Sequence, residues 1–202
     1  MTTQPDKITL TRPDDWHLHL RDGTQLAAVL PDTARQFARA IVMPNLVPPV
    51  TSVASAAAYR DRILAALPKG MRFDPLVTLY LTEATTPADI AEAKASGFVH
   101  AVKYYPSGAT TNSEAGVRDL ANCKATLAAM MDQIARCAAE TLARGAVTPS
   151  QIDRLVMVGG SSLLSSLEAA LCQLCPNAQI ENHNAMTAVA DGLALSAAGA
   201  FA

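Results

Sequence analysis

The sequence predicts an α/β fold, because short β-type runs alternate with helical segments along most of its 202 residues. Repeated strand-helix units of this kind favour a parallel sheet with helices outside it. Half of the residues are hydrophobic, which is enough to bury a sizeable core. Composition changes near the middle: every aromatic residue except Phe201, and most prolines, precede residue 107, whereas all four cysteines follow it. We therefore expect two units, residues 1–118 and 119–202.

In the first unit, four β-type runs are separated by helical segments. A helix is expected from Ser52 to Leu67, and a second from Thr86-Pro87 to Gly97, where an N-cap, an early proline and a terminal glycine mark its ends. The stretch from Thr24 to Ala38 is helical in pattern, but Pro31 predicts a break. The expected strands are Trp16–Leu20, Ala40–Met43, Leu76–Leu81 and Val99–Tyr104.

The second unit is also predicted to be α/β. Its first segment has apolar residues at helical spacing from Leu120 to Leu142 and is ended by Gly145. The elements expected after it are a helical turn at Thr148-Pro149, a strand at Arg154–Val158, a helix at Leu163–Leu174, a strand near Ile180 and a helix from Ala185 onward.

Charge and apolar patterning exclude several classes of function. The net charge is −2 and no long basic run occurs, so neither a nucleic acid nor a membrane surface is an expected partner. The sequence has no run of about 18 strongly apolar residues and no apolar leader, which predicts a cytoplasmic protein that acts on a small molecule. The cysteines, including the pair Cys172 and Cys175, fit helix faces, and we expect reduced, packed thiols.

The segment Asp15-Trp16-His17-Leu18-His19-Leu20-Arg21-Asp22-Gly23 carries the most chemistry. On a strand, His17, His19 and Arg21 share one face, whereas Trp16, Leu18 and Leu20 pack on the other. Two imidazoles at this spacing can ligate one zinc ion, and a guanidinium beside them can clamp a carboxylate. Alternating histidines also occur as hydrogen-bonded core or surface residues, so the pair alone is a weak signal.

This nine-residue string resembles the signature of the dihydroorotases, which are zinc-dependent amidohydrolases. Two single residues gain meaning from that resemblance: alone, Lys103 would be an exposed lysine and Asn45 a turn residue after Pro44. Further segments resemble the same family in the same order, namely Ala40–Asn45 with Pro48–Thr51, Tyr59-Arg60, and Ala101–Pro106 with Thr110–Ser113.

The resemblance implies about four of the eight units of a (β/α) barrel, with a two-zinc site at the C-terminal mouth of the strands. His17 and His19 match ligands of one zinc, and Lys103 matches the catalytic lysine that is carboxylated to bridge both metals. His19, Arg21 and Asn45 match contacts to the substrate, N-carbamoyl-L-aspartate or dihydroorotate.

Counterparts of the family's later histidines and catalytic aspartate are not recognisable after Lys103, and the surroundings of His183 do not resemble them. At most one zinc ion is therefore well supported. We expect this chain alone to be weakly active or inactive. Because an open half-barrel exposes sheet edges, we expect either self-association or packing of the second unit against the first.

The second unit resembles a different family. The stretch from Gln151 to Ser162, followed by Ala188–Ala194, is similar to the end of the nucleotide-binding domain of seventy-kilodalton heat-shock-type chaperones. This resemblance covers about residues 125–198. That resemblance implies a segment of actin-like ATPase type in which Gly159, Gly160 and Ser161 contact an adenosine, without ATP hydrolysis. Three hypotheses therefore stand: a dihydroorotase-type enzyme, a nucleotide-binding chaperone-like module, and a hybrid product in which neither half functions.

Overall fold

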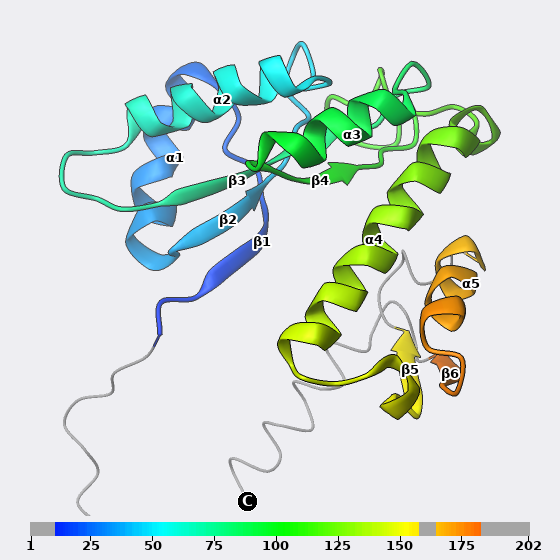
Figure 1. Cartoon of the computed structure of the whole chain (residues 1–202). Coiled ribbons are helices and arrows are strands. Elements are labelled where there is room, and N and C mark those ends of the chain that lie inside the picture. The colour runs from blue at the N-terminus through cyan, green and yellow to red at the C-terminus, as the bar shows by residue number, and fades with distance from the viewer. Residues whose placement is uncertain (1–10, 158–164, 183–202) are drawn as a thin grey trace, which may run out of the picture. The chain divides into compact units, whose positions relative to one another are not determined.

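The computed structural model describes residues 11–157 and 165–182, and Figure 1 traces their elements along the chain. The chain separates into two compact units, Met1–Thr126 and Leu127–Ala202. Each unit is described by itself. In the described ranges, no helix is both long and apolar enough to cross a membrane.

The first unit contains a four-stranded parallel sheet. Its strands lie in the order β1-β2-β3-β4, and each strand pairs in parallel with the next one along the sequence. Their carboxyl ends therefore meet at one edge, where side chains from all four strands can converge. This confirms the predicted α/β fold with a parallel sheet. The strands are β1 (Asp14–Leu18), β2 (Arg39–Val42), β3 (Asp74–Tyr80) and β4 (Val99–Lys103).

One helix connects each strand to the next: α1 (Gly23–Gln36), α2 (Val53–Ala66) and α3 (Pro87–Ser96). Figure 1 shows α1 and α2 side by side over the sheet. Ser52 caps α2 through a reciprocal pair of bonds with Ser55, and Thr86 caps α3 in the same way. The predicted starts of both helices are confirmed.

The core of the first unit lies between the sheet and these helices. Val42, Val77 and Leu79 point toward the helices and are essentially inaccessible to solvent. Leu30 of α1 and Ile63 of α2 cover them and are equally buried. Because the strands direct these side chains to one face, alternate residues such as Thr78 and Tyr80 fall on the other face of the sheet.

The predicted break at Pro31 was wrong, because α1 continues through it to Gln36. Leu26, Leu30 and Ala34 recur at four-residue spacing and are all buried, so their packing holds the helix together across the proline. Proline removes only the bond to the carbonyl of Ala27, an exposed residue whose carbonyl water can hydrate.

The prediction that Trp16 packs was also wrong, because this side chain is 64% exposed. Leu18 packs against the core and Leu20 is fully buried, as the alternation predicts. The pairing of β1 with β2 is irregular between Asp15 and Leu18, so strict alternation holds only from Leu18 onward.

The second unit contains the elements expected from its sequence, as far as it is described. The helix α4 (Lys124–Arg144) crosses the division between the units and is followed by a helical turn, Pro149–Gln151. The strands β5 (Arg154–Met157) and β6 (Gln179–Asn182) pair in parallel and are connected by a segment that includes α5 (Ser165–Leu174). The helix predicted from Ala185 lies outside the described residues.

The cysteines are all free thiols, as predicted. Cys175 is 2% exposed and Cys172 is half-buried. The pair therefore contributes to packing at the end of α5, and the expectation of a packed cysteine is met at Cys175.

Candidate metal and substrate site

His17 and His19 direct their rings to the same point near the end of β1. Their Nε2 atoms are 3.2 Å apart and their ring centroids 5.2 Å apart. Two nitrogens that each lie about 2.0–2.1 Å from one tetrahedral zinc ion are separated by roughly 3.3 Å. The observed pair fits a shared zinc ion, and both side chains are exposed enough to receive one.

The electrostatic surroundings of His19 favour its neutral form, which is the form that ligates metals. Burial lowers the pKa of His19, and the positive charges of Arg21 and Lys103 and the neighbouring His17 lower it further. A hydrogen bond with the Asn45 side chain acts in the opposite direction. The pKa of His19 therefore responds to Arg21, Asn45 and Lys103, which were predicted to form the site with it.

Arg21 occupies an uncommon backbone conformation, with φ 59°. The Tyr59 hydroxyl donates a hydrogen bond of 2.8 Å to the Arg21 carbonyl, which holds this turn between β1 and α1. The Arg21 guanidinium donates from Nη1 to the carbonyl of Asn45 at 3.4 Å, a weak bond. The turn thus directs the guanidinium toward the segment that follows β2.

Asn45 is 2% exposed and joins this segment to the loop after β4. Its Nδ2 donates to the carbonyl of Thr111 at 2.8 Å, and the Asn112 side chain donates back to the Asn45 carbonyl at 3.0 Å. Sequence reasoning assigned no role to Asn112. The signal was present, since Asn112 lies in one of the segments that resemble the family.

Lys103 is the last residue of β4 and lies in register with Tyr80 on β3. It is half-buried, and its Nζ lies 5.6 Å from the centroid of the Tyr105 ring. Its charge also acts on His19. Lys103, at the end of β4, therefore lies near enough to His19, which follows β1, for its charge to lower the pKa of that histidine.

Gly159, Gly160 and Ser161, together with His183, lie outside the described residues, so the predicted adenosine contact stays a prediction. In residues 11–157 and 165–182, no three His, Cys, Asp or Glu side chains gather in a way that could hold a metal. Of the metal ligands predicted from the sequence, the two imidazoles and Lys103 lie within those residues.

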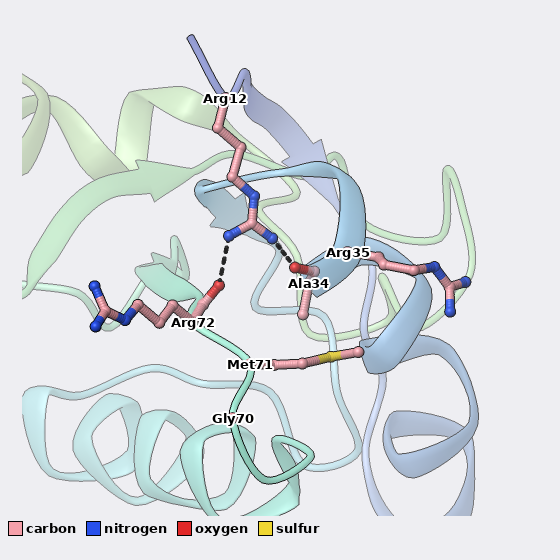
Figure 2. Close-up of a pocket in the computed structure, with 6 residues that line it drawn as sticks. All are labelled: Arg12, Ala34, Arg35, Gly70, Met71 and Arg72. Carbon is pink, nitrogen blue, oxygen red and sulfur yellow. Dashed lines mark hydrogen bonds between the residues drawn. The ribbon is translucent and has the colours of Figure 1, made fainter. Parts of the chain in front are cut away.

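A separate pocket of about 350 Å³ lies near the N-terminal ends of the strands (Figure 2). There the Arg12 guanidinium donates to the carbonyls of Ala34 and Arg72. The guanidinium thus connects the segment before β1 to the end of α1 and to the segment before β3. Ligands of parallel α/β folds bind at the opposite, carboxyl ends of the strands. The lining residues are Arg12, Ala34, Arg35, Gly70, Met71 and Arg72.

The sequence of this chain is similar to one family of proteins and to individual members of it. Residues 14–142 match the model of the Amidohydrolase family, a match that extends beyond residue 118 into α4. A dihydroorotase from Cupriavidus taiwanensis is 67% identical over 147 residues, which are 73% of this chain and 42% of that protein. A dihydroorotase from Alkalilimnicola ehrlichii is 72% identical over 127 residues, which are 63% of this chain and 37% of that protein. The chain thus spans less than half the length of these relatives.

Two solved structures resemble the fold. A crystal structure of dihydroorotase from Campylobacter jejuni has a TM-score of 0.59 and 28% identity, over 90% of this chain and 57% of the other. A dihydroorotase from Saccharomyces cerevisiae in complex with 5-fluoroorotic acid has a TM-score of 0.56 and 27% identity, over 83% of this chain and 46% of the other.

Proposed function

The chain belongs to the amidohydrolase family, and we propose that it forms part of a dihydroorotase. The proposed reaction is the reversible cyclisation of N-carbamoyl-L-aspartate to dihydroorotate. We further propose that β1 to β4 correspond to four strands of an eight-stranded barrel, because the two similar solved proteins are dihydroorotases that this chain matches over about half their length.

The observation that carries the proposal is the approach of two Nε2 atoms to 3.2 Å beside two cationic side chains. Two neutral imidazoles can hold their ring nitrogens at this distance through one N–H···N hydrogen bond. The same separation suits two ligands of one zinc ion, to which each imidazole would donate a lone pair. His17 and His19 are therefore the proposed zinc ligands.

When bound, zinc supplies Lewis-acid chemistry by lowering the pKa of a water molecule and polarising a carbonyl group. Lys103 is proposed to join the site as its carbamate: its neutral amine adds to carbon dioxide, an N–C bond forms, and a proton leaves. This change replaces a cation with an anionic oxygen ligand, so the residue changes from repelling the metal to binding it.

Arg21 is proposed to bind the carboxylate of the substrate. A guanidinium presents two parallel N–H donors to a carboxylate, and its weak contact with the Asn45 carbonyl leaves most of its donors free. Asn45 holds the loop after β4 against this position through Thr111 and Asn112. We propose that Asn45 and His19 also contact the substrate.

The described residues supply proposed ligands for one zinc ion. We therefore propose that this chain binds no more than one zinc ion tightly and that it hydrolyses dihydroorotate only slowly. The test is metal analysis of purified chain together with an assay of dihydroorotate ring opening. Wild type should retain zinc through dialysis, and a His17→Ala, His19→Ala double variant should lose it.

The matched control is His100→Ala, because His100 is an exposed histidine on β4 outside the histidine pair. Its zinc content should equal that of wild type. If the double variant retained as much zinc per protein as wild type does, the proposed zinc site would be contradicted.

A further inference from the structure

The turn between β1 and α1 has an uncommon backbone conformation. Arg21 and Gly23 both have positive φ angles, 59° and 58°, and Asp22 between them is the N-cap of α1. Glycine adopts this conformation readily, but a residue with a side chain does so only where surrounding contacts maintain it. The orientation of the Arg21 guanidinium therefore depends on the contacts that hold this turn.

Two residues of α2 hold the turn, and they lie three positions apart on one face of that helix. The Tyr59 hydroxyl donates to the Arg21 carbonyl at 2.8 Å. Arg62 donates to both carboxylate oxygens of Asp22, from Nη2 at 2.8 Å and from Nε at 3.1 Å. The Arg62 guanidinium also lies over the Tyr59 ring, 5.4 Å from its centroid. Tyr59 thus acts directly on Arg21, whereas Arg62 acts on the residue after it.

The Tyr59 hydroxyl is itself held in place by the core. The side chain is 1% exposed, so water does not compete for its hydrogen bond. Its ring packs in the same buried cluster as Leu20, the residue before Arg21. Burial raises the pKa of Tyr59, which keeps the hydroxyl protonated and able to donate at neutral pH. The core of the first unit therefore fixes the donor as well as the start of the turn.

We propose that Tyr59 is a positioning residue that orients the Arg21 guanidinium toward the substrate carboxylate. The inference rests on the proposed function and deepens it, because carboxylate affinity then depends on a side chain whose hydroxyl is bonded to the Arg21 backbone rather than to the substrate. Leu20, which is fully buried, separates the histidine pair from the turn. Loss of the Tyr59 hydroxyl should therefore affect carboxylate binding and leave zinc binding unchanged.

The test combines two measurements on the full, zinc-loaded chain: calorimetric titration with N-carbamoyl-L-aspartate, and zinc per protein after dialysis. Tyr59→Phe keeps the buried ring and removes only the donor. Its affinity for N-carbamoyl-L-aspartate should fall about fivefold, the change in an equilibrium constant that one net hydrogen bond typically supplies. Its zinc content should equal that of wild type.

Ser96→Ala is the matched control. Ser96 is half-buried and donates to the Ala93 carbonyl at 2.6 Å, but it lies before the start of β4, whereas Arg21 follows the opposite, carboxyl end of β1. The variant loses a bond of the same kind, from a side-chain hydroxyl to a backbone carbonyl, and should bind N-carbamoyl-L-aspartate as wild type does. If Ser96→Ala weakened binding as much as Tyr59→Phe, a general loss of stability would explain both results and overturn the proposal.

The remaining outcomes separate this inference from the proposed function. Parallel losses of ligand affinity and of zinc in Tyr59→Phe would show a general disturbance of the site and would contradict a positioning role. If wild type binds N-carbamoyl-L-aspartate and Tyr59→Phe binds it equally well, only the role of Tyr59 fails. If zinc-loaded wild type does not bind N-carbamoyl-L-aspartate, the proposed function itself fails.

Discussion

At the scale of single residues, the position of Arg21 depends on Tyr59. A left-handed backbone conformation costs about 1 kcal/mol or more for a residue with a side chain, so contacts elsewhere must maintain it. Tyr59 is almost fully buried in α2 and reaches the Arg21 carbonyl with its hydroxyl. Arg62, also on α2, stacks over the Tyr59 ring at 5.4 Å and pairs with Asp22. A helix surface thus fixes a turn at the proposed site.

Tyr59→Phe should therefore destabilise the first unit by about 1 kcal/mol, the typical net contribution of one hydrogen bond. Urea unfolding followed by the fluorescence of Trp16, the single tryptophan, measures this change. Tyr104→Phe serves as the control, because its hydroxyl is removed from an exposed side chain. Equal midpoints for Tyr59→Phe and wild type would show that the bond contributes nothing to holding the turn.

Glu83 provides a pH-dependent contact. Its carboxylate accepts hydrogen bonds from the backbone amides of Asp119 and Arg118, both at 3.0 Å, and these bonds lower the pKa of Glu83 below its ordinary value of 4.5. A lowered folded-state pKa means that the stabilisation is complete above the unfolded value. It is lost as pH falls through the folded-state pKa.

The amides of Arg118 and Asp119 should consequently lose protection from hydrogen exchange as the pH falls below 4.5 and through the lower folded-state pKa of Glu83, after correction for intrinsic exchange. In Glu83→Gln their protection should be lower and should change less with pH. The Leu81 amide, which donates to the Lys103 carbonyl, is the internal reference. A parallel pH response in wild type and Glu83→Gln would contradict the assignment.

At the scale of elements, the loop after β4 is shaped by its backbone. It runs from Tyr104 to Val117 and returns to its own start, because Val117 donates to the Tyr105 carbonyl. At Gly116 an added Cβ would lie 2.4 Å from that carbonyl oxygen, a distance that side-chain carbons do not tolerate. The close return of the loop therefore requires glycine at this position.

Gly116→Ala should destabilise the first unit by about 1–3 kcal/mol, because the backbone must move to relieve the contact. Gly108→Asn in the same loop is the control: its φ of 73° suits asparagine, and an added Cβ there meets nothing within 4 Å. Comparable urea midpoints for Gly116→Ala and Gly108→Asn would refute this explanation.

At the scale of the whole molecule, the two units differ in their buried apolar content. The first has a continuous core between its sheet and helices. Among the described residues of the second, the buried hydrophobic side chains are Met131, Met157 and Cys175. Since apolar burial is the main stabilising contribution, the second unit should unfold at a lower denaturant concentration.

Two buried thiols report on this difference. Cys123 is 1% exposed in the first unit and Cys175 is 2% exposed in the second. Labelling with a thiol reagent across a urea series, followed by peptide mass analysis, should modify Cys175 at lower urea than Cys123. Exposed Cys137 should react throughout and so calibrates the reagent. If both buried thiols lost their protection from labelling over the same range of urea concentration, the two units would unfold in a single cooperative transition.

The local sequence predicted the order and type of the described elements. These features depend on neighbours a few residues apart: Thr86 caps its own helix and Gly97 ends it, whatever the rest of the chain does. The local sequence also predicted that His17, His19 and Arg21 share one strand, which was wrong for His19 and Arg21: β1 ends at Leu18, and Arg21 lies in a left-handed turn.

Which distant residues lie near the proposed site depends on the tertiary structure. Asn112 reaches Asn45 across 67 positions, and Lys103 acts on His19 from another strand. The Pro31 helix and the exposed Trp16 likewise depend on packing and strand pairing that local patterns do not encode. Local preferences contribute fractions of a kcal/mol per residue, whereas burial of a large apolar side chain contributes about 1.5–3 kcal/mol. Where the two compete, long-range packing therefore determines the outcome.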